Sequence, residues 1–246
     1  GFKVWLGSQQ VEEKAWQREK ARMLFQLLLT RRNLLLSREE IFHLLWDGVD
    51  EETAARDLKV ALNALNKVLE PKRRARSSYF FIRRNNGGYG LNPSSGYSLD
   101  SDLFEKEVQK GLGEKSTDKA ISYLKSGLKR YQGEFLPELR YEDWAREERE
   151  RLLRFFLRGA ERLANLLLQE KREEESMEWA QKMLEIDSCW EEAYRILMVA
   201  SYRKKRRSEA IRWYKKCINE LDKELGVSPM KTIVELYENI RIEEPV

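Results

Sequence analysis

The sequence is poor in the residues from which most catalytic and metal sites are built. It contains one histidine, His43, and two cysteines, Cys189 and Cys217, and no two of these three residues lie at metal-ligand spacing. It also has no glycine-rich phosphate-binding loop and no nucleophile motif. We therefore expect a protein that is not an enzyme, that binds no metal or cofactor, and whose cysteines stay reduced in the cytoplasm.

Long apolar runs are missing as well. The segment Met23–Leu29 is much shorter than the roughly 18–20 apolar residues that span a bilayer, so we expect no membrane segment. The N-terminus has no secretory signal peptide. Because the first residue is Gly1 and not Met, we expect the chain to be a piece of a longer protein.

Charge is abundant but unevenly distributed. Charged residues make up 36% of the chain and hydrophobic residues 41%, which is typical of a folded domain with charged helix surfaces. Residues 1–100 carry 17 Lys and Arg against 12 Asp and Glu, whereas residues 101–246 carry 29 against 30. Nine basic and two acidic residues fall within 56–86. Such a cluster favours a polyanionic partner, and the alternative is a solvated charged face.

The basic cluster lies on a pattern that predicts a winged helix. Ser37 and Glu40 form a capping box that starts a short helix, and the turn 47–50 leads to a second helix over 53–69. That helix is apolar at Leu58, Leu62, Leu65 and Leu69. Residues 79–91 then alternate and turn like a hairpin. A hairpin at 2–11, a helix at 18–30 and a short strand at 32–36 are expected upstream, and the turn-rich segment 92–96 predicts a domain boundary.

The remainder of the chain is predicted to be helical. The expected helices cover 102–111, 117–132, 141–170, 173–186, 190–205, 208–225 and 229–241. A spacing of 34 residues aligns Leu163 with Leu197 and Met183 with Cys217, and it also aligns Ala164 with Met198 and Ser176 with Ala210. This period indicates a tetratricopeptide-like repeat, and the alternative is an ordinary antiparallel bundle.

Several segments together resemble a known family. The segments that carry the resemblance are Ser37–Glu39, Leu45–Trp46, Ala55–Leu62, Gly87–Tyr89, Leu99–Phe104, Tyr131–Pro137, Asp143–Ala145, Glu148–Arg149 and Glu224–Pro229. Through them the chain resembles bacterial transcriptional activator domain regulators of the antibiotic-regulatory type, which join an OmpR-type winged helix to a tetratricopeptide-like domain.

This resemblance implies a mainly α protein with a small β part. A winged-helix DNA-binding domain over 1–95 would be followed by an all-α, tetratricopeptide-like activator domain over 96–246. The implied function is sequence-specific binding of double-stranded DNA at promoter half-sites by a transcriptional regulator, usually an activator. The implied partners of the helical domain are a second copy of the chain, RNA polymerase, or a sensor or ATPase domain outside this chain. The resemblance also implies another strand before Phe2.

The DNA contacts are expected from four places. With the apolar stripe of helix 53–69 turned inward, the residues left for DNA are Arg56, Lys59, Val60, Asn63, Asn66 and Lys67. The resemblance places base or phosphate contacts at Arg56, Val60, Asn63 and Asn66, although Asn63, Ala64 and Asn66 stand where many OmpR-type helices carry arginine. Minor-groove contacts are expected from the hairpin tip, at Arg83, Arg84, Asn85 and Asn86. Phosphate contacts are expected from Arg38, Lys72, Arg73, Arg74 and Arg76.

Two alternatives stay open at this point. The asparagines could lie on a solvated helix face without any DNA contact. The whole N-terminal domain could also be an output module or interaction scaffold that binds protein instead of DNA, because helix 53–69 carries few arginines.

Overall fold

The computed structural model describes residues 1–74, 77–85 and 87–244 and divides into two compact units. The N-terminal unit comprises Gly1–Ser98 and Glu134–Arg151, and the helical unit comprises Leu99–Gly133 and Leu152–Val246. Segment 134–151 was expected in the second domain, but it packs with the N-terminal unit. The predicted domain boundary between residues 95 and 96 stays a prediction.

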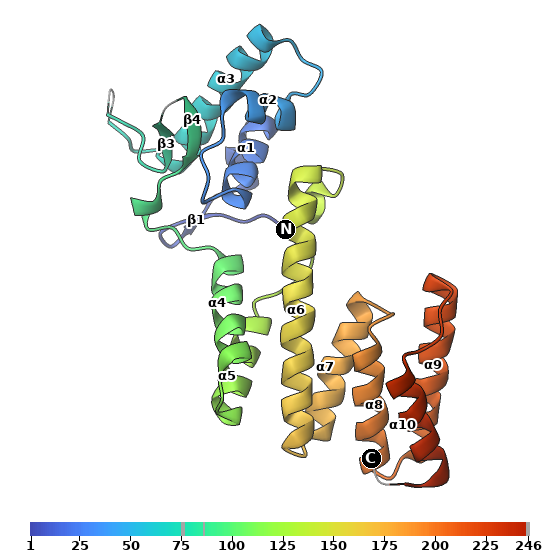
Figure 1. The fold of residues 1–246 in the computed structure, drawn as a ribbon. Helices are drawn as coiled ribbons and strands as arrows, with labels where there is room; N and C mark the ends of the chain where they lie inside the picture. Colours follow the sequence, from blue (N-terminus) through green and yellow to red (C-terminus); the bar gives the residue numbers. More distant parts are fainter. Residues whose placement is uncertain (75–76, 86, 245–246) are drawn as a thin grey trace. The chain divides into compact units, whose positions relative to one another are not determined.

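Within the described part of residues 1–98, the N-terminal unit contains three α-helices and two antiparallel hairpins (Figure 1). In chain order the elements are β1 Trp5–Leu6, β2 Gln9–Gln10, the 3₁₀ helix η1 Glu13–Ala15, α1 Glu19–Thr30, α2 Arg38–Leu45, α3 Glu51–Leu69, β3 Ile82–Asn85, β4 Gly88–Leu91 and the 3₁₀ helix η2 Pro93–Ser95. Helix α1 buries Ala21, Leu24, Phe25 and Leu28 at helical spacing, as predicted.

The predicted strand at 32–36 is reduced to a single bridge between Leu36 and Tyr89. The β4 backbone lies close to this segment, because a Cβ atom at Gly90 would stand only 2.6 Å from the carbonyl oxygen of Leu34. Glycine at this position therefore lets the hairpin pack against residues 34–36.

The inserted segment 134–151 completes the core of the N-terminal unit. It contains the 3₁₀ helix η3 Pro137–Leu139 and the start of α6. Leu136, Leu139, Trp144 and Ala145 are buried in the same apolar cluster as α1 and α3. Burial of these side chains removes apolar surface from water, so the segment contributes to the stability of this unit.

Polar contacts also attach the inserted segment to α1. The Gln26 amide donates to the Glu138 carboxylate at 3.0 Å, and Arg31 pairs with Glu147 at 3.0 Å. Arg32 pairs with Glu148 at 3.4 Å. Burial alone would raise the pKa of Glu148, but the hydrogen bond and charge of Arg151, together with Arg32, lower it.

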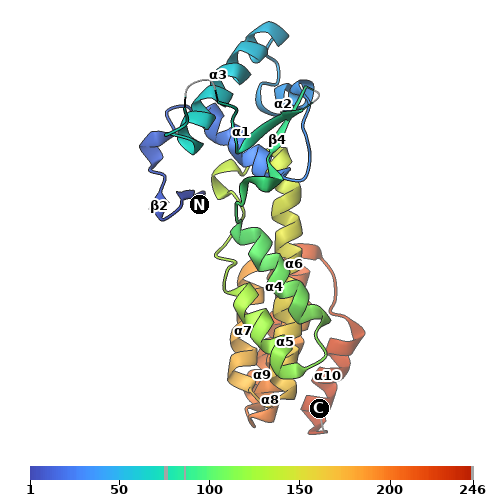
Figure 2. The ribbon, with the colours of Figure 1, turned by 90° about the vertical axis from the view of Figure 1, so that its left-hand side faces the viewer.

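The helical unit consists of successive antiparallel helices, of which α4 and α5 lie side by side (Figure 2). Its helices are α4 Asp100–Gly113, α5 Thr117–Leu128, α6 Asp143–Gln169 from Leu152 onward, α7 Glu173–Ile186, α8 Glu191–Arg203, α9 Arg207–Leu225 and α10 Lys231–Ile242. No described helix is both long enough and apolar enough to cross a membrane.

The 34-residue repeat corresponds to two successive helix pairs, α6–α7 and α8–α9. Leu163 and Leu197 are fully buried at equivalent positions, as are Ala164 and Met198. The Ser176 hydroxyl of α7 donates to the Ala164 carbonyl of α6 at 2.7 Å. The repeated positions are thus the inner contacts of each pair, as a tetratricopeptide-like arrangement requires.

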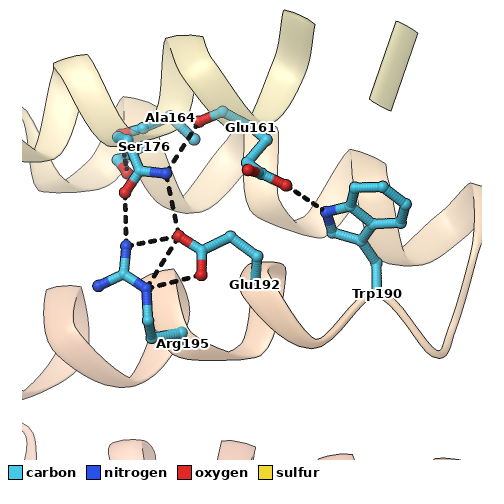
Figure 3. A network of polar contacts seen from close by, with 7 residues as sticks. Glu161, Ala164, Ser176, Trp190, Glu192 and Arg195 are labelled. Atoms are coloured by element: carbon cyan, nitrogen blue, oxygen red, sulfur yellow. Dashed lines mark hydrogen bonds and ion pairs between the residues drawn. The ribbon is translucent and has the colours of Figure 1, made fainter. Parts of the chain in front are cut away.

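A polar network joins α6 to the start of α8 (Figure 3). The Trp190 indole donates to Glu161 at 3.0 Å, and the Asn165 amide donates to Glu192 at 3.0 Å. Arg195 donates to both carboxylate oxygens of Glu192 at 2.8 Å. Burial, and secondarily the nearby charge of Glu192, raises the pKa of Glu161.

Candidate nucleic-acid interface

Helix α3 begins earlier than its predicted start. Asp50 is the N-cap, and its carboxylate accepts from the Thr53 amide at 2.9 Å, so the helix begins at Glu51 instead of Thr53. The same hydrogen bond lowers the pKa of the Asp50 carboxyl. On α2 the predicted capping box is confirmed, since Ser37 and Glu40 bond reciprocally at 3.1 and 2.7 Å.

The solvent-facing side of α3 carries most of the predicted residues. Arg56, Lys59, Val60, Asn63 and Lys67 are all exposed. Of these five residues, only Arg56 forms an ion pair with another described residue, a 3.4 Å contact with the half-buried Asp57. The helix therefore presents cations, an amide and one small apolar side chain to any ligand that approaches this face.

Asn66 is the exception, and its predicted exposure is wrong. Only 4% of Asn66 is exposed, and within the described residues its side-chain oxygen has no hydrogen-bond partner. The buried stripe of α3 differs from the predicted one. It also includes Ala54 and Ala61, whereas Leu62, which was predicted to be in the core, is only half-buried. Asn66 adjoins the buried Leu65 and Leu69, and the core covers it.

The hairpin β3–β4 follows with four paired positions, from Ile82 opposite Leu91 to Asn85 opposite Gly88. Arg84 and Asn85 are exposed, whereas Arg83 is half-buried and its Nε atom has no partner among the described residues. The Arg84 guanidinium lies 5.6 Å from the centre of the Tyr89 ring. Asn86 lies outside the described residues.

The two turn glycines have different structural roles. Gly87 has a φ of 80°, which suits the turn, but Gly88 does not have positive φ. Gly88 is needed for space, because a Cβ atom there would stand 3.2 Å from the Leu36 carbonyl oxygen.

The linker between α3 and β3 holds the third predicted group. Lys72 and Arg74 are exposed, whereas Arg73 is half-buried, stacks 4.2 Å from the Tyr79 ring centre and donates to the Ser77 carbonyl. Glu70 at the end of α3 accepts from the backbone amide of Phe80 at 2.7 Å, which ties the linker back to the helix. Arg76 lies outside the described residues.

Arg38, the fourth predicted location, opens α2. Its guanidinium lies 5.6 Å from the Phe42 ring centre, and the side chain is half-buried. Part of the Arg38 side chain therefore packs against Phe42 within α2, and its positive charge lies near the N-terminus of the helix.

The structure adds a group of residues that the sequence analysis missed. A groove of about 760 Å³ separates α3 from the segment that precedes α1, and its walls include Gln9, Gln10, Lys14, Gln17 and Arg18. No local motif marks these residues, because they meet α3 only through the tertiary fold. Among the described residues, no cluster of three or more His, Cys, Asp or Glu residues could hold a metal ion.

Comparison with known proteins identifies the class of the chain. Residues 99–241 match the family described as the Bacterial transcriptional activator domain. The chain belongs to this family. The match supports a role in transcriptional regulation and confirms the activator-domain part of the expected family; it does not extend to residues 1–98, where the OmpR-type winged helix was expected. It also includes segment 134–151, which lies in the N-terminal unit.

Solved structures provide a second comparison. EmbR of Mycobacterium tuberculosis, in complex with a low-affinity phosphopeptide, is similar with a TM-score of 0.77 and 20% identity over 92% of this chain. The chain spans 60% of the length of that EmbR chain. A second solved structure is the TPR2B domain of yeast Sti1 in a complex with pHsp70. It aligns over its whole length with 60% of this chain, at 16% identity and a TM-score of 0.42. No curated protein matches the sequence. The EmbR similarity shows a shared fold.

Proposed function

We propose that this protein is a sequence-specific, DNA-binding regulator of transcription whose N-terminal unit is an OmpR-type winged helix. The observation that carries the proposal is the exposed face of α3, which presents Arg56, Lys59, Val60, Asn63 and Lys67. In this proposal α2 and α3 form the helix-turn-helix, and the hairpin β3–β4 is the wing. The proposal includes no catalytic step.

In the proposed complex, α3 enters the major groove, which admits one α-helix. Asn63 pairs with adenine through its amide, and Arg56 pairs with guanine or a phosphate. Val60 offers an apolar contact of the kind that a thymine methyl group accepts. Asn66 is not among the proposed contacts, because it is buried.

The other basic residues position the duplex. Arg84 and Asn85 of the wing reach the adjacent minor groove, together with the exposed part of Arg83. Lys72 and Arg74 contact phosphates, which fix orientation without reading sequence.

The helical unit mediates protein contacts in this proposal. Its candidate partners are a second copy on an adjacent half-site, RNA polymerase, or a sensor or ATPase domain outside this chain. The regulator acts as an activator, and a cytoplasmic location follows from access to bacterial DNA.

The proposal is tested by duplex binding of single variants. Arg56→Ala and Asn63→Ala should each weaken the specific duplex by roughly 1–3 kcal/mol per lost base contact. Asn219→Ala removes an exposed amide from α9 of the helical unit and serves as the matched control. Arg74→Ala should weaken specific and random duplexes equally. If Arg56→Ala, Asn63→Ala and Asn219→Ala all bind the specific duplex as wild type does, α3 does not read DNA and the protein-binding alternative gains support.

A further inference from the structure

The groove beside α3 has one wall on the helix that we propose to read DNA. Val60, Asn63, Ala64 and Lys67 recur at three- and four-residue spacing, so they lie along one side of α3 and form this wall. The opposite wall comes from segment 9–18, which includes β2 and η1. Three α3 side chains, Val60, Asn63 and Lys67, thus belong both to the proposed reading face and to the groove.

The polar side chains on the walls of the groove are cations and amides together with one acid, Glu12, and they lie among apolar residues such as Trp16 and Val68. Lys14, Arg18 and Lys67 supply positive charge, and Gln9 and Gln17 supply amide donors. All five side chains are exposed. Within the described residues, Arg18 and Lys67 have no ion-pair partner, whereas Lys14 pairs with the exposed Glu12 at 2.7 Å. Free cations and amide donors suit phosphate oxygens.

Dimensions indicate what the groove would meet on DNA. An α-helix with its side chains is about 10–12 Å in diameter. The major groove of B-DNA is about 12 Å wide. A helix in that groove is therefore flanked at once by the sugar–phosphate backbones that border it. With Val60 and Asn63 facing the bases, one of those backbones passes along the adjoining side of α3, where Lys67 lines the groove.

We propose that the groove between α3 and segment 9–18 seats the sugar–phosphate backbone at one border of the major groove. Arg18 contacts a phosphate from one wall, and Lys67 contacts the backbone from the other. Gln17 adds an amide hydrogen bond. The segment before α1 is thereby a further part of the DNA-binding surface. This inference rests on the proposed function of α3.

The test compares two single substitutions in the N-terminal segment of the full chain. Arg18→Ala removes a cation from the groove wall, and the Arg18 side chain makes no capping hydrogen bond to α1. Lys3→Ala removes an exposed cation that does not line the groove and serves as the matched control. Circular dichroism melts establish that both variants fold as wild type does.

Binding to a selected duplex and to a random duplex is then measured over a salt series. One lost phosphate contact lowers the slope of log K against log salt by about 0.9, so Arg18→Ala should show this reduction on both duplexes. Lys3→Ala should keep the wild-type slope. Hydroxyl-radical footprinting should show that Arg18→Ala loses protection of backbone positions at one border of the site, while protection elsewhere is retained.

The possible results separate this inference from the proposed function. If wild type binds DNA with a steep salt dependence but Arg18→Ala matches Lys3→Ala in slope and footprint, the groove does not hold the backbone, and only this inference is overturned. If wild type binds no duplex at either end of the salt series, both the inference and the proposed function are overturned.

Discussion

Arg149 provides the most direct test of the inserted segment as part of the N-terminal unit. The residue is 8% exposed, and its guanidinium donates to the carbonyls of Phe135 and Leu139 at 3.0 Å and of Leu136 at 3.3 Å. It also pairs with Glu134 at 3.2 Å. One side chain therefore satisfies several backbone acceptors in the segment whose apolar residues complete the core around α1.

The substitution Arg149→Met keeps much of the side-chain length but removes every donor. Each buried polar group left unsatisfied costs about 1–3 kcal/mol. The Leu139 carbonyl keeps its bond from the Glu142 amide, whereas the Phe135 carbonyl loses the donor described for it, so we predict that the free energy of unfolding falls by about 1–3 kcal/mol. Urea unfolding followed by circular dichroism measures this loss, and hydrogen exchange of the α1 amides locates it.

The chain offers a matched control one turn earlier. Arg146 lies on the same helix, its side chain is 63% exposed, and it pairs only with the exposed Asp143 among the partners described, at 3.1 Å. Arg146→Met should change the free energy of unfolding by no more than about 0.5 kcal/mol. Equal stability of the Arg146→Met and Arg149→Met variants would refute the reasoning that segment 134–151 supports the N-terminal unit.

Two further predictions concern the helical unit. Gly111→Ala should lower the free energy of unfolding by about 1–3 kcal/mol, because a Cβ atom there would stand 2.5 Å from Leu124 Cγ. Gly113→Ala is the control, because a Cβ atom at that position would have no neighbour within 4 Å, and it should be neutral or stabilising. Thermal melts of both variants measure the difference, and an equal loss of stability in both would contradict the close α4–α5 contact. Burial and the charge of Glu192 raise the pKa of Glu161, so wild-type stability falls as pH rises through that folded pKa. As pH rises from about 4 to about 7, the Glu161→Gln variant should therefore become more stable relative to wild type in urea titrations. A difference in unfolding free energy that does not change with pH would contradict the raised pKa of Glu161.

The features that the sequence predicted correctly are those with local causes. The Ser37–Glu40 capping box depends on residues three positions apart, so its pattern alone identified it. The repeat was detectable because Leu163 and Leu197 occupy equivalent positions in successive helix pairs. The start of α3 was placed two residues too late because Asp50, which was assigned to the preceding turn, is the N-cap of the helix.

The features that were missed depend on contacts between distant residues. The burial of Asn66 follows from how the core covers one edge of α3, which helical periodicity does not reveal. Segment 134–151 joins the N-terminal unit through contacts with α1, more than a hundred positions earlier in the chain. The groove between segment 9–18 and α3 has the same origin, since nothing in the sequence near Arg18 indicates that it lines the same groove as Lys67.

The central claim is that this chain reads DNA sequence through α3, and a selection from random duplexes tests it most directly. The purified chain is used to select duplexes at two salt concentrations, and the retained sequences are compared. The account predicts one enriched motif whose binding weakens steeply at the higher salt, as contacts from several exposed cations require. Retention without any enriched motif at both salt concentrations would contradict it.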